Sequence, residues 1–340
     1  MLKISVILAT YNRADSLREA LDSLSAQTLP IPDYEVIVVD DGSTDETPRV
    51  LAEDWPFQLQ VLRQQNSGAT QARMAGAEAA AGEVIVIVDD DITFGPSYLE
   101  GLVELHSAPE PRLGMGSYLP DLENPVSRFH RIHAEINADR PPFEREVEVP
   151  FTACVTNNVS LPRDVFFAIG GLGNPVGDPA ATWGDVDLGY RAFRHGVRSW
   201  RSGRALLVHR DYNFHTFDNA LERCYKIARM APALVQTHPA VGPSLPMFED
   251  KWPIDFSKDS SHLIVRKLLR KVSSLAPIRI LLRGLARLTG ALSPWDALTR
   301  PFYRWSLGAE LHRGLRAGLQ ELGEPGRPSL SEPVRSASKS

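Results

Sequence analysis

Glu-Val-Ile-Val-Ile-Val-Asp-Asp-Asp, residues 83–91, is the stretch that decides the predicted fold. Val84 to Val88 form an unbroken β-branched run, which is typical of a strand buried on both faces of a parallel sheet. Three carboxylates follow, Asp89, Asp90 and Asp91. Adjacent like charges cost free energy unless a cation neutralises them. Open α/β sheets bind ligands at the carboxyl ends of their strands, so we expect Mg²⁺ or Mn²⁺ carrying a phosphate here, since both ions prefer oxygen ligands.

Strand and helix patterns alternate on the amino-terminal side of this stretch. Lys3 to Ala9, Glu35 to Val39 and Leu59 to Leu62 are predicted strands, and an Ala-rich helix is predicted over about 69 to 81. This alternation predicts a doubly wound parallel sheet with polar residues gathered at one rim. No Gly-x-Gly-x-x-Gly follows the first strand and no P-loop motif occurs, which disfavours both a dinucleotide site and a P-loop.

The starts of two helices can be predicted from residues that favour the first positions of a helix. Asp15 or Ser16 is expected to cap the helix after the first strand, and Pro162 is expected to begin a later helix. Another helix is predicted to begin in the segment Trp183–Arg191. Two carboxylates lie in its first turn, where the helix dipole favours negative charge, and capping alone would account for them.

Composition and charge limit the class of protein. The chain has 340 residues, of which 43% are hydrophobic and 23% charged, and this balance is typical of a soluble globular protein. Residues 262–340 carry 14 Lys and Arg but 5 Asp and Glu, although the whole chain has a net charge of −5. A basic segment on an acidic body suggests an anionic partner, either a membrane surface or a nucleic acid, unless its charges only solvate helix faces.

Cysteine content and hydropathy bear on the compartment. Two cysteines, Cys154 and Cys224, allow no disulfide framework and no Cys-based metal site. No run of about 18 apolar residues occurs, so we predict no membrane-spanning helix. A strand begins within three residues of the start, so we expect no signal peptide and a cytoplasmic location, with the inner membrane face as a peripheral site.

Seven segments together resemble the family 2 glycosyltransferases, which have the GT-A fold. They occur in the family's order within residues 3–215 and are Ser5–Asn12, Asp40–Asp45, Asn66–Gly76, Asp89–Asp91, Asn157–Ser160, Trp183–Arg191 and His209. Each is a weak signal alone, whereas all seven in order make a strong one. The resemblance implies an α/β fold with a mostly parallel sheet flanked by helices, and a hexosyltransferase that uses a nucleotide sugar and inverts the anomeric centre.

The resemblance also implies the catalytic groups. A divalent ion, Mn²⁺ or Mg²⁺, held by Asp89 and Asp91 neutralises the leaving diphosphate as a Lewis acid. The general base of the family falls on Asp185, with Asp187 as the second candidate, which is expected to hold the donor or acceptor sugar. His209 matches a position that reaches the metal or the diphosphate, although a lone histidine is more often structural.

The remaining site residues implied by the resemblance concern the donor. Ala9, Tyr11 and Asp41 would hold the nucleoside, with Asp41 accepting from the base, and Arg73 would lie near the phosphates. Asp89 and Asp90 are assigned to donor binding as well. The chain departs from the family at Met74, where Asn is often found after the arginine, and at Gly184, where Glu is commoner, and both departures loosen the inference about the donor.

Two rival functions remain open at this stage. A sugar-phosphate nucleotidyltransferase also places carboxylates and a metal on such a sheet, but residues 9–12 are not the Gly-rich basic loop that it needs. A non-catalytic nucleotide-sugar binding module is disfavoured by the intact acids at 41, 89, 91 and 185. The sequence identifies neither the sugar nor the nucleotide, and the acceptor could be a sugar, a lipid-linked glycan, a small molecule or a peptide, in polysaccharide or glycoconjugate biosynthesis.

We expect three parts: a catalytic domain at 1–215, a helical C-terminal extension at 216–322 that is basic from 262, and a disordered tail at 323–340. Two basic amphipathic helices are predicted within 262–288, with an apolar stripe of Leu263, Ile264, Leu268 and Val272. Aromatic residues follow, namely Trp295, Phe302, Tyr303 and Trp305. Such helices predict peripheral membrane contact through 262–305, or packing on the catalytic domain or a second subunit, and no nucleic acid is expected.

Overall fold

The computed structural model describes residues 2–121, 127–139, 145–177, 183–210, 215–293 and 295–323. The chain divides into two compact units. The first unit comprises Met1–Asp121 and Asn137–Arg210, and the second comprises Leu122–Ile136 and Asp211–Ser340. The predicted catalytic domain, 1–215, includes the segment 122–136, which belongs to the second unit. The predicted disordered tail lies outside the described residues apart from Gly323.

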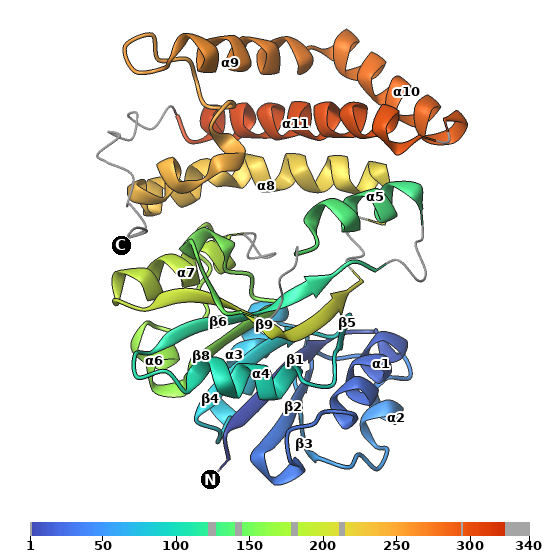
Figure 1. The fold of residues 1–340 in the computed structure, drawn as a ribbon, viewed down its shortest axis with the longest axis vertical. Helices are drawn as coiled ribbons and strands as arrows, with labels where there is room; N and C mark the ends of the chain where they lie inside the picture. The colour runs from blue at the N-terminus through green and yellow to red at the C-terminus, as the bar shows by residue number, and fades with distance from the viewer. Residues whose placement is uncertain are drawn as a thin grey trace. The chain divides into compact units, whose positions relative to one another are not determined.

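A nine-stranded sheet runs through the first unit in the order β3-β2-β1-β4-β8-β6-β9-β5, with β7 paired to β9 (Figure 1). Its first four strands are β1 (Ile4–Thr10), β2 (Tyr34–Asp40), β3 (Gln58–Arg63) and β4 (Val84–Asp89), and they pair in parallel. The four predicted strands are therefore confirmed. The register aligns Ala9 with both Val39 and Asp89, so the carboxyl ends of three strands meet at one rim.

The other part of the sheet is mixed. Its strands are β5 (Ile92–Phe94), β6 (Arg112–Leu119), β7 (Val147–Val149), β8 (Asn158–Pro162) and β9 (Arg198–His209). β8 runs antiparallel to β4 and β6, β6 runs parallel to β9, and β5 and β7 run antiparallel to β9. The order of these strands in the sheet depends on pairing between segments that are far apart in the sequence. Such pairing leaves no periodic signal in the sequence, so the strand order could not be predicted.

Helices connect these strands. They are α1 (Ala14–Ser25), α2 (Thr47–Leu51), α3 (Ala69–Ala79), α4 (Tyr98–His106), α6 (Arg163–Ala168) and α7 (Gly184–Arg194). Two predicted boundaries were wrong. Helix α1 begins at Ala14, with Arg13 rather than Asp15 or Ser16 in the capping position, and Pro162 ends β8 and precedes α6. The amide of Ala14 instead donates to Asp45 Oδ2 at 3.1 Å, a partner from another loop.

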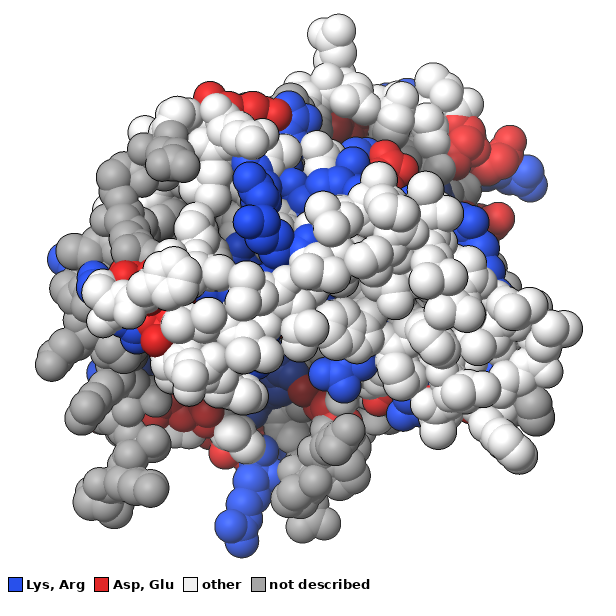
Figure 2. Space-filling model, turned by 90° about the horizontal axis from the view of Figure 1, so that it is seen from above, with Lys and Arg blue, Asp and Glu red and all other residues white. Residues whose placement is uncertain are grey.

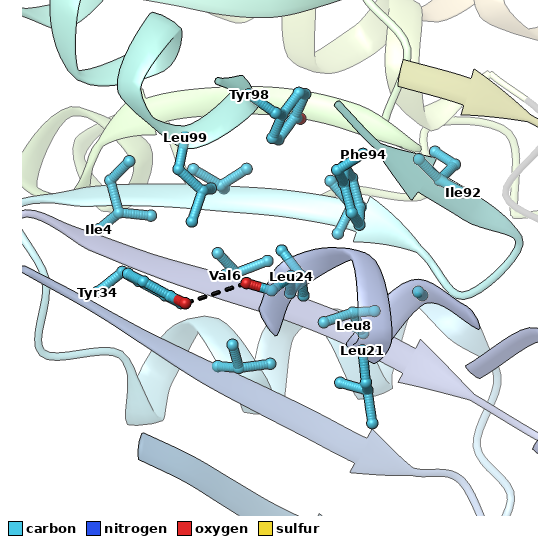
Figure 3. Close-up of a cluster of buried hydrophobic side chains, with 14 of the residues drawn as sticks. Ile4, Val6, Leu8, Leu21, Leu24, Tyr34, Ile92, Phe94, Tyr98 and Leu99 are labelled. Carbon is cyan, nitrogen blue, oxygen red and sulfur yellow. Dashed lines mark hydrogen bonds between the residues drawn. The ribbon is translucent and has the colours of Figure 1, made fainter. Parts of the chain in front are cut away.

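The unbroken apolar run in β4 is explained by burial on both faces of the sheet. Val84, Val86 and Val88 belong to one hydrophobic cluster, whereas Ile85 and Ile87 belong to another. Figure 3 shows side chains of the first cluster, in which the hydroxyl of Tyr34 donates to the carbonyl of Leu24 at 3.0 Å. The strand predicted to be buried on both faces is confirmed, because alternate side chains enter two separate cores.

A half-buried histidine predicts that the fold is sensitive to acid. His106 Nε2 lies 2.8 Å from Ser160 Oγ, and burial, with a smaller effect of Arg112, lowers the pKa of His106 from 6.5 to about 4. Between these values the unfolded chain binds a proton that the folded chain does not, so stability should fall as the pH falls. We expect the free energy of unfolding of His106→Gln, measured with urea, to fall less between pH 7 and pH 4.5 than that of the wild type. The two slopes should differ by up to about 1.4 kcal/mol per pH unit. An unchanged pH slope would contradict this.

The second unit is helical. It contains α5 (Arg128–Asn137) up to Ile136, α8 (Phe217–Thr237), α9 (Ser261–Ser273), α10 (Ala276–Leu292) and α11 (Asp296–Glu321), and α9 and α10 confirm the two helices predicted within 262–288. Helices α8 and α11 pack closely because α11 carries glycines at the contact: a Cβ on Gly318 would lie 2.0 Å from the carbonyl oxygen of Arg229. In the described part of the chain, every helix is too short or too polar to cross a bilayer.

Candidate active site

The acidic triplet lies at the rim of the sheet, where β4 ends and the chain turns into β5. Arg13 Nη1 lies 3.0 Å from Asp90 Oδ1 and 3.2 Å from Asp91 Oδ2. Arg73, on α3, forms an ion pair with Asp89. The sequence prediction named only a metal ion as the neutralising cation, whereas the chain itself supplies two guanidinium groups. Repulsion between the three carboxylates is therefore reduced without an ion.

Asp90 faces into the protein. It is 3% exposed, and its second oxygen accepts a hydrogen bond from Thr10 Oγ1 at 2.7 Å. Burial raises the pKa of Asp90 to about 6, although Arg13 opposes this shift. Because both carboxylate oxygens are bound by groups of the chain, Asp90 joins the end of β1 to the triplet.

Asp89, Asp91 and His209 come together as a group that could hold a metal ion, each offering one ligand atom within 4.8 Å of the others. The pairing of β5 with β9 places His209 opposite Ile92, and so beside Asp91. Asp91 Oδ1 is buried, accepts no hydrogen bond within the described part of the chain, and lies 3.2 Å from His209 Nε2. Two carboxylates and an imidazole suit Mn²⁺, so these residues fit a divalent ion.

Two residues that received no role in the sequence analysis orient His209. Asn157 Nδ2 lies 3.3 Å from His209 Nδ1, and the hydroxyl of Tyr118 donates to Asn157 Oδ1 at 2.7 Å. Such outer contacts fix the orientation of a ligating imidazole. Asn157 lies in one of the segments that carry the family resemblance, so the sequence could have identified it as a site residue. Tyr118 comes from β6 and had none, and Arg13 was visible only as the residue that follows the matched segment Ser5–Asn12.

The residues assigned to the nucleoside lie at the same rim. Asp41 is 4% exposed; its Oδ1 accepts from Gln64 Nε2 at 2.7 Å and from the amide of Ser67 at 2.8 Å, and its Oδ2 accepts from the amide of Gly68 at 2.8 Å. Asp41 therefore holds the loop that leads into α3, and any contact with a base would be additional to these bonds. Tyr11 is 46% exposed and available to a ligand.

The two carboxylates at the start of α7 differ in their surroundings. Asp187 is 4% exposed and its Oδ2 forms an ion pair with Arg191 at 2.8 Å. Arg191 in turn donates to the carbonyls of Ile169 and Gly171, so Asp187 supports the loop after α6. Asp185 is half-buried, and its Oδ1 accepts from the amide of Val186 at 2.8 Å. Of the two residues, Asp185 is the less buried.

Comparison with known proteins places this site in a family. Residues 5–171 match the model described as Glycosyl transferase family 2. The matched residues make up just under half of the chain and include most of the segments that resemble the family 2 glycosyltransferases. The resemblance that the seven segments indicated is thereby confirmed. The rim residues from Ala9 to Asp91, together with Asn157, lie within the matched range, whereas Asp185 and His209 lie beyond it.

Curated relatives of the chain carry several names. A validoxylamine A glucosyltransferase from Streptomyces hygroscopicus subsp. jinggangensis is 31% identical over 224 residues, 57% of this chain and 52% of that protein. A glucosyl-dolichyl phosphate glucuronosyltransferase from Haloferax volcanii is 30% identical over 183 residues, 52% of this chain and 58% of that protein. The chain thus spans about half the length of the curated relatives that it matches.

Solved structures of similar fold cover nearly the whole chain. The mannosyltransferase PcManGT from Pyrobaculum calidifontis, in complex with GDP-Man and Mn²⁺, has a TM-score of 0.59 at 19% identity and covers 94% of this chain and 87% of its own. S. aureus TarS 1–349 in complex with UDP-GlcNAc has a TM-score of 0.52 at 15% identity and covers 95% of this chain and 93% of its own. These likenesses confirm the predicted GT-A fold with its helical C-terminal region.

Proposed function

We propose that this chain is an inverting glycosyltransferase that moves a sugar from a nucleoside-diphosphate sugar to an acceptor hydroxyl. The observation that carries the proposal is the group of Asp89, Asp91 and His209 at the rim where β1 and β4 end. Breaking the anomeric C–O bond leaves negative charge on the diphosphate, and this group would hold Mn²⁺ or Mg²⁺. The bound ion supplies Lewis-acid stabilisation of that charge.

The chain's own residues have distinct roles in the proposal. Arg73 lies beside Asp89 and presents a guanidinium, whose fork of donors matches phosphate oxygens. Ala9, Tyr11 and Asp41 form the side of the rim that holds the nucleoside. Asp185 takes the proton from the acceptor hydroxyl as that oxygen attacks the anomeric carbon opposite the leaving group, so the anomeric centre inverts.

The names of similar proteins support the donor class more than the acceptor. The structural neighbours are in complex with GDP-Man or UDP-GlcNAc, so we propose a nucleotide sugar as the donor here. One relative is named for validoxylamine A and another for glucosyl-dolichyl phosphate. Because these differ in kind, the proposal for this chain names only an acceptor hydroxyl. Cytoplasmic location and peripheral contact through 262–305 stay predictions.

Donor hydrolysis tests the proposal. We expect the full chain to release nucleoside diphosphate slowly from at least one radiolabelled UDP-, GDP- or TDP-sugar, in the presence of Mn²⁺ but not of EDTA. The matched control is Glu46→Gln, which changes an exposed carboxylate paired only with Arg49 within the described residues, and which should hydrolyse the donor at the wild-type rate. Formation of the nucleotide sugar from a nucleoside triphosphate and a sugar phosphate would indicate a nucleotidyltransferase, and binding without turnover would indicate a binding module.

A further inference from the structure

Helix α9 turns its apolar side to solvent and its charged side into the protein. Val265, Leu268 and Val272 are 53%, 46% and 46% exposed, whereas Lys267 is 6% exposed. This is the reverse of the usual arrangement of an amphipathic helix on a globular protein. The sequence predicted the apolar stripe but not the side on which it lies.

Ion pairs hold α9 in this orientation. Lys267 Nζ lies 2.6 Å from Asp259 Oδ2 and donates to the carbonyl of Pro253 at 3.1 Å. Arg270 Nε lies 2.8 Å from Asp250 Oδ2, and its guanidinium lies over the ring of Trp305 at 4.8 Å. Turning the helix over would leave buried carboxylates without partners, which is costly.

Helix α10 repeats the arrangement. Arg283 Nη2 and Arg279 Nε lie 2.5 Å and 3.3 Å from Oε1 of Glu310, a fully buried residue of α11. The opposite side of α10 carries Leu281, Leu288 and Leu292, which are 59%, 53% and 74% exposed. The cations of α10 therefore face α11 while its aliphatic side chains face solvent.

The exposed sides of α9 and α10 carry several large apolar side chains. We define the α9–α10 face by Val265, Leu268, Val272, Ile280, Leu281 and Leu292, each 46% or more exposed. Figure 2 looks onto the side of the molecule where α9 and α10 lie in Figure 1, and uncharged residues dominate it. Proteins that act as free monomers rarely expose this many large apolar side chains on two consecutive helices, so the face is expected to meet a partner.

Charge indicates what that partner is. From Ser260 to Trp295 the chain has seven Lys and Arg and no Asp or Glu, although six of the seven cations form ion pairs with carboxylates from other segments. Lys271 is exposed and forms no ion pair with any described residue. Trp295, which directly precedes α11, is 72% exposed, and indole side chains favour the membrane–water interface. An apolar face in a segment without carboxylates matches the acyl chains and anionic headgroups of a bilayer.

Two other occupants fit less well. In a symmetric pair of copies the same patch meets itself, so two segments that both carry net positive charge would lie against each other. The segment 324–340 has only Leu330 and Val334 as large apolar side chains, too few to cover the face.

We propose that the α9–α10 face binds the interface of an anionic phospholipid bilayer, with both helices parallel to the membrane plane. The proposal does not rest on sugar transfer, since every residue that carries it lies in the second unit. If it is correct, the chain performs its reaction at a membrane surface.

Vesicle co-sedimentation of the full chain tests the proposal. We expect the wild type to pellet with vesicles of phosphatidylcholine and phosphatidylglycerol and to remain in the supernatant with phosphatidylcholine alone. Replacing Ile280, Leu281 and Leu292 together by Ser should lower the ratio of bound to free protein at least tenfold. The matched control replaces Ile31, Val61 and Val147 by Ser, which are 44%, 43% and 52% exposed in the first unit, and should bind as the wild type does.

A second measurement separates insertion from surface attraction. Brominated acyl chains should quench tryptophan fluorescence in the wild type, and Trp295→Phe should remove most of the quenching while vesicle binding persists. Circular dichroism must show that each variant keeps the wild-type helix content. Wild-type protein that ignores anionic vesicles overturns the proposal, and so does a dimer in light scattering that the triple Ser variant dissociates.

Discussion

Asp91→Asn is expected to abolish sugar transfer and to weaken metal-dependent binding of the nucleotide. One oxygen of Asp91 is buried without a hydrogen bond beside His209, and the other accepts from Arg13. The amide keeps the shape of the side chain but removes the negative charge that an ion needs. Lewis-acid stabilisation is worth several kcal/mol, so turnover should fall by about 10³-fold or more.

Initial rates across a Mn²⁺ titration, with calorimetry of nucleoside diphosphate binding with and without Mn²⁺, measure this effect. Glu46→Gln serves again as the control for loss of an exposed carboxylate. Wild-type turnover by Asp91→Asn would exclude Asp91 as a metal ligand in the reaction. A loss of turnover with unchanged Mn²⁺-dependent binding would exclude it as well, because binding and transfer are proposed to use the same ion.

Asp185→Asn should leave donor binding nearly intact and lower turnover by about 10²–10⁴-fold, which is the usual contribution of a positioned general base. Donor hydrolysis and transfer kinetics give the KM of the donor and the turnover number separately. The structural reason is that Asp185 is half-buried at the start of α7, whereas Asp187 is tied to Arg191.

Asp187→Asn is the matched comparison for this prediction. Removing one partner of its ion pair leaves Arg191 without its carboxylate, so the loss should appear mainly as a lower melting temperature, with about 3–5 kcal/mol of stability lost. If Asp187→Asn keeps its melting temperature and loses turnover while Asp185→Asn remains active, the two roles are reversed.

Much of the candidate site could be predicted because its residues follow strand ends directly. Asp89 and Asp91 end β4, and Ala9 lies at the end of β1, so local pattern and parallel pairing were enough to bring them to one rim. His209 was matched through the family alone, and the antiparallel pairing of β5 with β9 brings it to Asp91. Arg13 could not be predicted as a partner of the triplet, because nothing in its local sequence indicates which carboxylates it reaches.

The sequence by itself determined the four parallel strands, the acidic rim and the two basic amphipathic helices, because each depends on residues close together in the chain. Only the tertiary structure decided that guanidinium groups neutralise the triplet, that Asp187 supports a loop while Asp185 is less buried, and that α9 and α10 expose their apolar sides. A helical pattern defines two faces but not which one is buried. That choice was made by carboxylates distant in sequence from the cations they bind, such as Glu310 with Arg283, because a buried charge must lie beside its partner.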